Sequence, residues 1–310
     1  MQALWMVLGA LIFATMGVCV KIASAWFSSA ELVLYRGFIG VVFLWVFARS
    51  RGVSLATRYP GMHAWRSLVG VVSMGAWFYA IAHMPLATAM TLNYMSSVWI
   101  AAFLVGGVLL AWAPVPRRDG SVPRPPLQGP LVLTVLAGFG GVVLLLRPTI
   151  GDHEAFAGLV GLLSGLTAAF AYMQVVALSR AGEPETRTVF YFAVGAVVAG
   201  GLATLAGSAT PWSAWTWGHA FWLLPVGVLA ALGQLCMTRA YARSTTRGGT
   251  LLVANLQYSG IVFAAIYSVL LFGDSIDAQG WAGMSLIVAS GVAATVLRER
   301  SLPRAPGEEH

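Results

Sequence analysis

The sequence predicts an all-α integral membrane protein of about ten transmembrane helices, arranged as two inverted five-helix repeats. Apolar stretches of roughly 17–26 residues recur along the chain, and a helix of about 20 residues crosses a hydrocarbon core. Basic residues gather in alternate gaps between these stretches, and similar strings recur about half a chain apart. The apolar stretches are residues 4–22, 32–48, 67–84, 87–112, 127–146, 155–178, 188–205, 221–241, 250–272 and 278–297.

Composition excludes a soluble domain. The chain has 310 residues, of which 58% are hydrophobic and 9% are charged. A soluble protein carries about 25% charged residues. The net charge of +7 does not indicate nucleic-acid binding, because the arginines are spread over short loops and no basic aromatic groove is formed. Cys19 and Cys236 lie in separate apolar stretches without a metal-ligand spacing. We therefore expect no cofactor, no metal site and no disulfide.

The basic residues predict the orientation in the membrane. About 15 of the 18 lysines and arginines fall in alternate gaps or in the tail. Basic loops stay cytoplasmic during insertion, so both termini are expected in the cytoplasm. The exceptions are Lys21 and Arg147 in the other gaps, and Arg36 inside the second stretch. The residues that set the pattern are Arg49, Arg51, Arg58, Arg66, Arg117, Arg118, Arg124, Arg180, Arg187, Arg239, Arg243, Arg247, Arg298, Arg300 and Arg304.

Internal similarity predicts the domain organisation. Residues 8–15 resemble 163–170, residues 80–99 align with 240–259, and residues 140–147 align with 290–298. Each half then holds five spans, and an odd number makes the second half enter the membrane from the opposite side. We expect a first repeat over 1–150, a second, inverted repeat over 151–298, and a cytoplasmic tail over 299–310. The Pro/Arg-rich stretch 113–129 is an insertion in a cytoplasmic loop.

Arg36 is the foremost candidate for substrate binding. It lies about five residues inside its span, roughly 7 Å deep at about 1.5 Å per residue. A charge at this depth is costly and is a functional candidate by default. Its planar fork matches a carboxylate or a phosphate. The alternatives are a structural pair with Glu31 and snorkelling to the headgroups, and the latter reading also applies to Lys21.

Other polar and aromatic residues fall on shared helix faces. Pairs three or four residues apart meet on one side of a helix. Each pair either lines a pocket or joins helices through hydrogen bonds. The candidates are Tyr79 with His83, Asn93 with Ser97, and Asn255 with Tyr258, together with Trp99 and Tyr172, which can stack on a substrate.

Four strings make the chain resemble the EamA-type branch of the drug/metabolite transporter superfamily. They are ELVLYRG (31–37), YAIAHMPLATAMTL (79–92), GLVGLLSGLTAAFAY (158–172) and VLLFGDSIDAQGWAGMSLIVASGV (269–292). The resemblance covers nearly the whole chain and implies a ten-helix carrier of small metabolites, often an exporter. Where the family usually has a glutamate closing spans four and nine, this chain has Asp274 at span nine, and span four ends in AWAP with no acid.

Together these features predict a secondary transporter rather than an enzyme. We expect alternating access in a multi-pass protein of the bacterial inner membrane, acting as a monomer or homodimer among membrane lipids. No phosphate-binding G-x-x-x-x-G-K-[ST] loop is present, so ATP is not the direct energy source. The net positive charge near Arg36 favours carboxylate-bearing substrates such as amino acids or organic acids. The alternative is a flippase for a lipid or a polyprenyl carrier.

Overall fold

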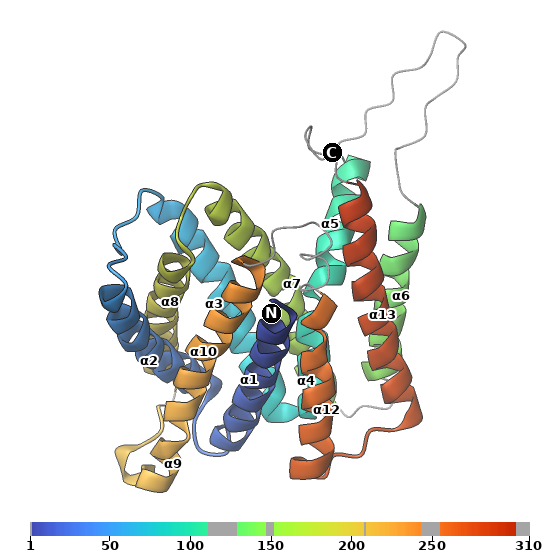
Figure 1. Cartoon of the computed structure of the whole chain (residues 1–310). Helices are drawn as coiled ribbons and strands as arrows, with labels where there is room; N and C mark the ends of the chain where they lie inside the picture. Colours follow the sequence, from blue (N-terminus) through green and yellow to red (C-terminus); the bar gives the residue numbers. More distant parts are fainter. Residues whose placement is uncertain (1, 111–128, 147–151, 208, 243–254, 302–310) are drawn as a thin grey trace, which may run out of the picture.

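The computed structural model describes residues 2–110, 129–146, 152–207, 209–242 and 255–301, and this part of the chain is helical with no strand (Figure 1). The predicted basic residues Arg117, Arg118, Arg124, Arg147, Arg243, Arg247 and Arg304 lie outside it, as does almost all of the 113–129 insertion. The elements are α1 (Gln2–Ala23), α2 (Ser29–Ser50), α3 (Pro60–His83), α4 (Leu86–Tyr94), α5 (Ser96–Leu110), α6 (Gly129–Leu146), α7 (Asp152–Arg180), α8 (Glu185–Ala206), η1 (Trp212–Ala214), α9 (Trp217–Phe221), α10 (Leu223–Ala242), α12 (Ser259–Phe272) and α13 (Ala278–Ser301).

The helices have the length and apolar character of membrane spans. Within the described residues, 7 helical segments are long and apolar enough to cross a membrane. Two shorter apolar segments, Val132–Leu145 and Ser259–Phe272, add to them. α3 has 24 residues, which is long enough, but it is not among the apolar spans. The expectation of an all-α membrane protein with roughly ten helices is confirmed.

Two of the predicted spans are interrupted, where the sequence indicated continuous helices. The stretch 87–112 divides at Met95 into α4 and α5, and the stretch 250–272 has a turn at Gln257 and Tyr258 before α12. At both places the backbone bonds reach back three residues: Met95 donates to Leu92 at 3.2 Å, and Tyr258 donates to Asn255 at 3.1 Å. Such tight turns within a helix often mark functional hinges.

The packing of the helices repeats itself along the chain. α3 packs on α7, and the corresponding pair five spans on is α10 with α1. α3 also contacts α8 as α10 contacts α2, and α4 contacts α7 as α12 contacts α1. Two further close pairs, α2 with α8 and α6 with α13, join equivalent spans and lie at opposite edges of the bundle (Figure 1). α6 and α13 thus pack against each other at the periphery of the bundle.

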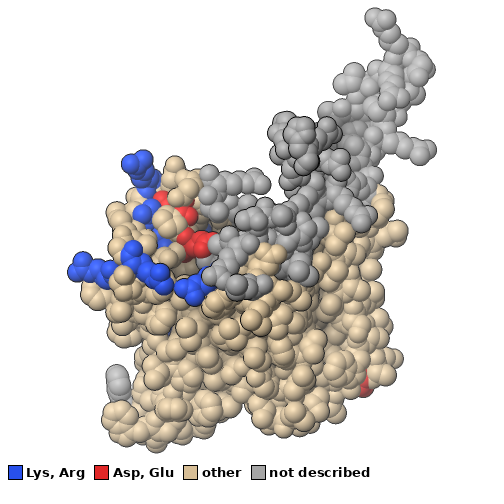
Figure 2. Space-filling model, in the orientation of Figure 1, with Lys and Arg blue, Asp and Glu red and all other residues tan. Residues whose placement is uncertain are grey.

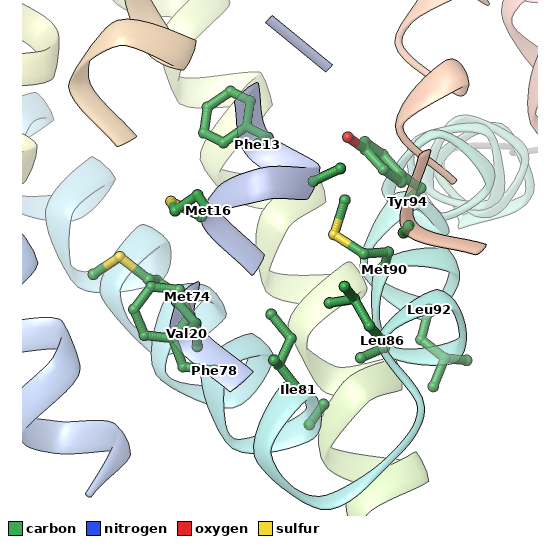
Figure 3. Close-up of a cluster of buried hydrophobic side chains, with 14 of the residues drawn as sticks. Phe13, Met16, Val20, Met74, Phe78, Ile81, Leu86, Met90, Leu92 and Tyr94 are labelled. Atoms are coloured by element: carbon green, nitrogen blue, oxygen red, sulfur yellow. The ribbon is translucent and has the colours of Figure 1, made fainter. Parts of the chain in front are cut away.

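The main core surrounds α1. Apolar side chains of α1, α3 and α4 meet there, with the phenol ring of Tyr94 among them (Figure 3). Phe78 and Met16 are fully buried. Burying such a side chain contributes roughly 1.5–3 kcal/mol. The labelled members are Phe13, Met16, Val20, Met74, Phe78, Ile81, Leu86, Met90, Leu92 and Tyr94.

Glycines set the close approach of α2 to α8. A Cβ atom on Gly37 would lie 2.8 Å from the backbone nitrogen of Val197, and one on Gly200 would lie 2.6 Å from that of Leu34. Any larger residue at either position would push the two helices apart. This contact brings Arg36, the residue before Gly37 in α2, against α8.

Basic side chains gather at one end of the bundle. In the view of Figure 2 the visible lysine and arginine side chains lie at the end where α13 finishes. We call this end, which includes Arg49, Arg51, Arg58 and Arg187, the arginine-rich face. The opposite face has Lys21, Asp274 and Asp277, with the exposed aromatic side chains of Trp217 and Phe221. The sequence pattern therefore corresponds to a real asymmetry of the described structure.

Candidate functional site

Two buried arginines form the centre of the candidate site. Arg36 of α2 and Arg66 of α3 are 8% and 7% exposed. Both guanidinium groups face the ring of Phe192 in α8, with their Cζ atoms 5.4 Å and 4.1 Å from its centroid. A guanidinium over an aromatic ring is attracted by the ring quadrupole. Three helices thus supply one cationic cluster.

These guanidinium groups have unpaired donors. Arg36 Nε, and Nε and Nη1 of Arg66, are buried and have no hydrogen-bond partner among the described residues. The predicted alternative of a structural pair between Arg36 and Glu31 is wrong. Glu31 instead accepts bonds from the backbone nitrogen of Ser28 at 2.8 Å and from Thr210 at 2.9 and 2.8 Å. It closes the capping box of α2 and ties this helix to the segment before η1.

The cluster is electrostatically expensive. Arg36 and Arg66 repel each other. A single arginine at the centre of a membrane helix costs about 2.5–3.5 kcal/mol on insertion scales. Burial of a charge is compensated only when a partner of opposite sign is present. Since the described part of the chain offers these two residues no acid, an anion from outside the chain is the partner that the site lacks.

Aromatic and amide groups lie beside Arg66. Tyr172 of α7 interacts with Arg66 and with the side chain of Gln257. It is also within electrostatic reach of Tyr94, whose ring centroid lies 6.1 Å from that of Tyr258. Although these partners come from α3, α4 and the turn before α12, Tyr172 is 36% exposed. Its ring is therefore partly exposed, while its hydroxyl is buried among these partners.

A polar layer lies next to the break between α4 and α5. Asn93 donates to Ser164 Oγ at 3.2 Å, and Ser73 donates to the Ser164 carbonyl at 2.8 Å. The predicted amide Asn93 thus joins α4 to α7. Its predicted counterpart Asn255 is different, because its Oδ1 is buried without a partner in the described structure. Asn255 therefore still has an acceptor to offer.

Other predicted residues do not join this cluster. Tyr79 and His83 stack at 4.0 Å near the end of α3, and His83 is exposed on the face opposite the arginines. Trp99 packs on Phe139 of α6 at 4.8 Å. Ser97 is half-buried in α5. Of the predicted residues, the structure brings Arg36, Tyr172 and Tyr258 towards one region, with Asn93 in the layer beside it.

The sequence analysis missed Arg66, Phe192 and Gln257. Arg66 was counted with the loop arginines, because it follows Arg58 and precedes the apolar stretch that begins at residue 67. In the structure α3 begins at Pro60, which places Arg66 two turns inside the helix. Proline at the first helical position was the available signal for this earlier start. No pattern in the sequence connects Phe192 to the arginines.

The fold and this site define the protein as a multi-pass membrane transporter, in which a buried charged cluster and interrupted helices lie within the span region. Residues 1–107 match the EamA-like transporter family. The chain is 32% identical over 294 residues to a pseudopaline exporter of Pseudomonas aeruginosa, covering 93% of both chains. It is 27% identical over 297 residues to a riboflavin transporter of Rhizobium johnstonii, covering 94% of this chain and 89% of that one.

The chain belongs to the EamA-like transporter family. Among solved proteins, one crystal structure superposes with a TM-score of 0.59 at 18% identity, covering 96% of this chain and 98% of the other. At this identity the likeness concerns the fold alone. The predicted family resemblance is confirmed.

Proposed function

We propose that this transporter moves small carboxylate-bearing metabolites, such as organic acids or amino acids, by alternating access. The observation that carries the proposal is the pair Arg36 and Arg66, which are buried at one ring and have no acidic partner in the described structure. A cationic substrate would enter a repulsive field there. An anionic or zwitterionic substrate supplies the charge that the two guanidinium groups lack.

The strength of this interaction follows from the environment. Two opposite charges about 4 Å apart attract by about 1 kcal/mol in water and by about 4 kcal/mol at an effective dielectric constant of about 20. Guanidinium groups also bind carboxylates through two parallel N–H···O bonds. Arg36 therefore favours a planar anionic group over a neutral one of the same size.

Support for alternating access comes from the repeated packing. Every pairing described above between helices of the two halves has its counterpart five spans away. We infer two inverted repeats, 1–150 and 151–298, that rock against each other around the arginine cluster. The interrupted helices meet at Tyr94 and Tyr258, one from each half. We further propose that the arginine-rich face is cytoplasmic, as the insertion rule requires.

The relatives support transport of small molecules and suggest probes. Their names specify pseudopaline and riboflavin, and one of them is named as an exporter. Export is therefore the direction that we propose for this chain. Both molecules belong in the first panel of test substrates, beside organic acids, amino acids and quaternary amines.

The alternative is a flippase, which would need a headgroup site continuing into an apolar groove. A groove of about 520 Å³ does lie on the outer side of α2 and against α10, with Phe38, Val42 and Leu224 in its lining. Neither Arg36 nor Arg66 lines it. The groove suits a lipid tail, but the charged site is separate from it, so the carrier of soluble metabolites is the better interpretation.

The test is transport into proteoliposomes with three variants. Arg36→Lys weakens transport of carboxylates because a point charge replaces the bidentate fork. Arg36→Ala nearly abolishes it while the protein still inserts. Arg58→Ala, at an exposed loop position, is the matched control and keeps wild-type rates. Undiminished transport by inserted Arg36→Ala, or a strict preference for cations, contradicts the proposal.

A further inference from the structure

The two arginines form a site with two charges at short range. Each Cζ atom lies close to the same Phe192 ring, at 5.4 Å for Arg36 and 4.1 Å for Arg66. The distance between the two Cζ atoms therefore cannot exceed the sum of these two distances. They are close enough to repel each other across the ring. A ligand of only a few carbon atoms can reach both.

One carboxylate cannot satisfy this site. A guanidinium has five N–H donors in a fixed fork, and a carboxylate paired in the fork–fork manner uses one such fork. If a single carboxylate pairs with Arg36, Arg66 keeps a buried charge and the unpaired atoms Nε and Nη1. Leaving a buried charge unpaired is costly. The guanidinium group of Arg66 therefore needs a second anionic group as its partner.

The best-buried acidic side chains of the described structure are all bonded to residues outside the arginine cluster. Glu31 is bonded to Ser28 and Thr210. Asp274 pairs with Lys21 at 3.3 Å on the opposite face. Glu183 contacts His63 at 3.2 Å and Arg187 at 3.0 Å. None of these carboxylates contacts the cluster, so the second negative group is expected to arrive with the ligand.

We propose that the substrate carries two anionic groups, joined by a short and largely apolar spacer, and that Arg66 is the residue that selects for the second group. Phe192 lies against both cations and supplies apolar surface between them. The hydroxyl of Tyr172, beside Arg66 and Gln257, can bond to the rest of the substrate. The inference rests on the proposed function, since it takes the arginine cluster as the binding site.

The experiment compares ligands that differ in a single charge. Full-length protein in lipid nanodiscs is titrated with butyrate and glutarate, with hexanoate and adipate, and with inorganic phosphate, and binding is measured by calorimetry and thermal shift. The wild type is expected to bind each dicarboxylate at least tenfold more tightly than its monocarboxylate. Tenfold corresponds to about 1.4 kcal/mol.

Variants of Arg66 distinguish a loss of substrate selectivity from a loss of protein stability. Arg66→Gln is expected to lower the ratio of dicarboxylate affinity to monocarboxylate affinity by tenfold or more, because Arg36 still holds one group while the second group loses its partner. Arg66→Lys keeps the charge and recovers part of the preference, which a merely structural role would not produce. The thermal transition of each ligand-free variant, measured in the same nanodiscs, shows that it is folded.

The outcomes distinguish the two proposals. Equal affinities for mono- and dicarboxylates, or an undiminished preference in folded Arg66→Gln, overturn the present inference and leave the proposed function standing. Tight binding of phosphate with no preference for dicarboxylates also overturns it, because one doubly charged group then suffices. Absence of any carboxylate binding or transport in the wild type overturns the proposed function itself, and this inference with it.

Discussion

Lys21 Nζ lies 3.3 Å from Asp274 Oδ2, although 253 positions separate the two residues in the chain. Lys21 also donates to the backbone carbonyl of Met84 at 3.1 Å, and Ser268 donates to Asp274. The sequence analysis read Lys21 as an anchor at the headgroups. Its side chain is only 17% exposed, and it instead joins the ends of α1, α3 and α12 on the face opposite the arginines.

The Lys21–Asp274 ion pair predicts a measurable coupling free energy between substitutions at the two positions. Asp274→Asn and Lys21→Met each lower the thermal stability, and their effects are less than additive. We expect a coupling of about 1 kcal/mol, since the pair is partly exposed and such pairs contribute about 0.2–1 kcal/mol at surfaces. A double-mutant cycle on unfolding in detergent measures it. Strictly additive losses would show that the two charges do not support each other.

At the arginine-rich face, Glu183 joins three elements. It accepts bonds from Thr57 Oγ1 at 3.0 Å, from Arg187 Nη1 at 3.0 Å and from the ring of His63 at 3.2 Å. Arg187 in turn donates to the carbonyl of Ser54 at 2.8 Å. Burial by itself raises the pKa of Glu183, but the bonds from Arg187, His63 and Thr57 outweigh it, and the pKa lies below its ordinary value.

Because folding lowers the pKa of Glu183, the contribution of this carboxyl to the free energy of unfolding decreases at low pH. The contribution of Glu183 is complete above the pKa of the unfolded chain, about 4.3. It is lost as the pH falls through the lower pKa of the folded state. Glu183→Gln is expected to cost about 1.5–3 kcal/mol at pH 7 and to flatten the stability curve below pH ~4.3. Glu185→Gln, two positions on, is the comparison: burial raises the pKa of this carboxyl, so its removal is expected to steepen the loss of stability at low pH and not to flatten it.

The unpaired arginines predict a gain in stability on mutation. Arg66→Met removes a buried charge that repels Arg36 and has unpaired donors. Replacing buried charges by apolar groups of similar volume is often stabilising by about 1–4 kcal/mol. We therefore expect a higher melting temperature for ligand-free Arg66→Met and a loss of dicarboxylate binding. A lower melting temperature would indicate that the cluster is a structural element satisfied within the chain.

Gly161 and Gly165 form a GxxxG string in α7, and a larger residue at either position is expected to disturb the packing of this helix. A Cβ on Gly165 would lie 2.4 Å from the carbonyl oxygen of Leu92, and one on Gly161 would lie 2.8 Å from its side chain. Gly165→Ala is expected to destabilise by about 1–3 kcal/mol, as overpacking does. Gly75→Ala in α3 meets nothing within 4 Å and is the matched control, expected to be neutral or slightly stabilising. Equal behaviour of the two variants would contradict this packing.

Labelling in intact cells tests the orientation. Ala56→Cys lies in the exposed loop of the arginine-rich face, and Gly218→Cys lies on the opposite face. Both are introduced into a background with Cys19 and Cys236 replaced. A membrane-impermeant maleimide is expected to label position 218 and to spare position 56 until the cells are permeabilised. The reverse pattern would invert the proposed topology.

The sequence predicted the span pattern because apolar length and basic gaps are local properties. It predicted Arg36 because a charge inside an apolar stretch needs no structure to be recognised. It missed Arg66 because the apolar count starts at residue 67, whereas the helix starts at Pro60. It also missed the turn at Met95, since neither Gly nor Pro marks it. The partners of Arg36 depend on a contact between α2 and α8, and the sequence does not specify such contacts.

The Arg36–Arg66–Phe192 cluster also bears on how the chain is made. α2 and α3 enter the membrane early in synthesis, and each carries an arginine that insertion scales disfavour by about 2.5–3.5 kcal/mol at a helix centre. The aromatic ring that both arginines contact belongs to α8, which is translated much later. The cluster is therefore complete only after α8 has been synthesised and inserted. A nascent chain stopped before α8 would present two charges to lipid, which is a feature that membrane quality control can recognise.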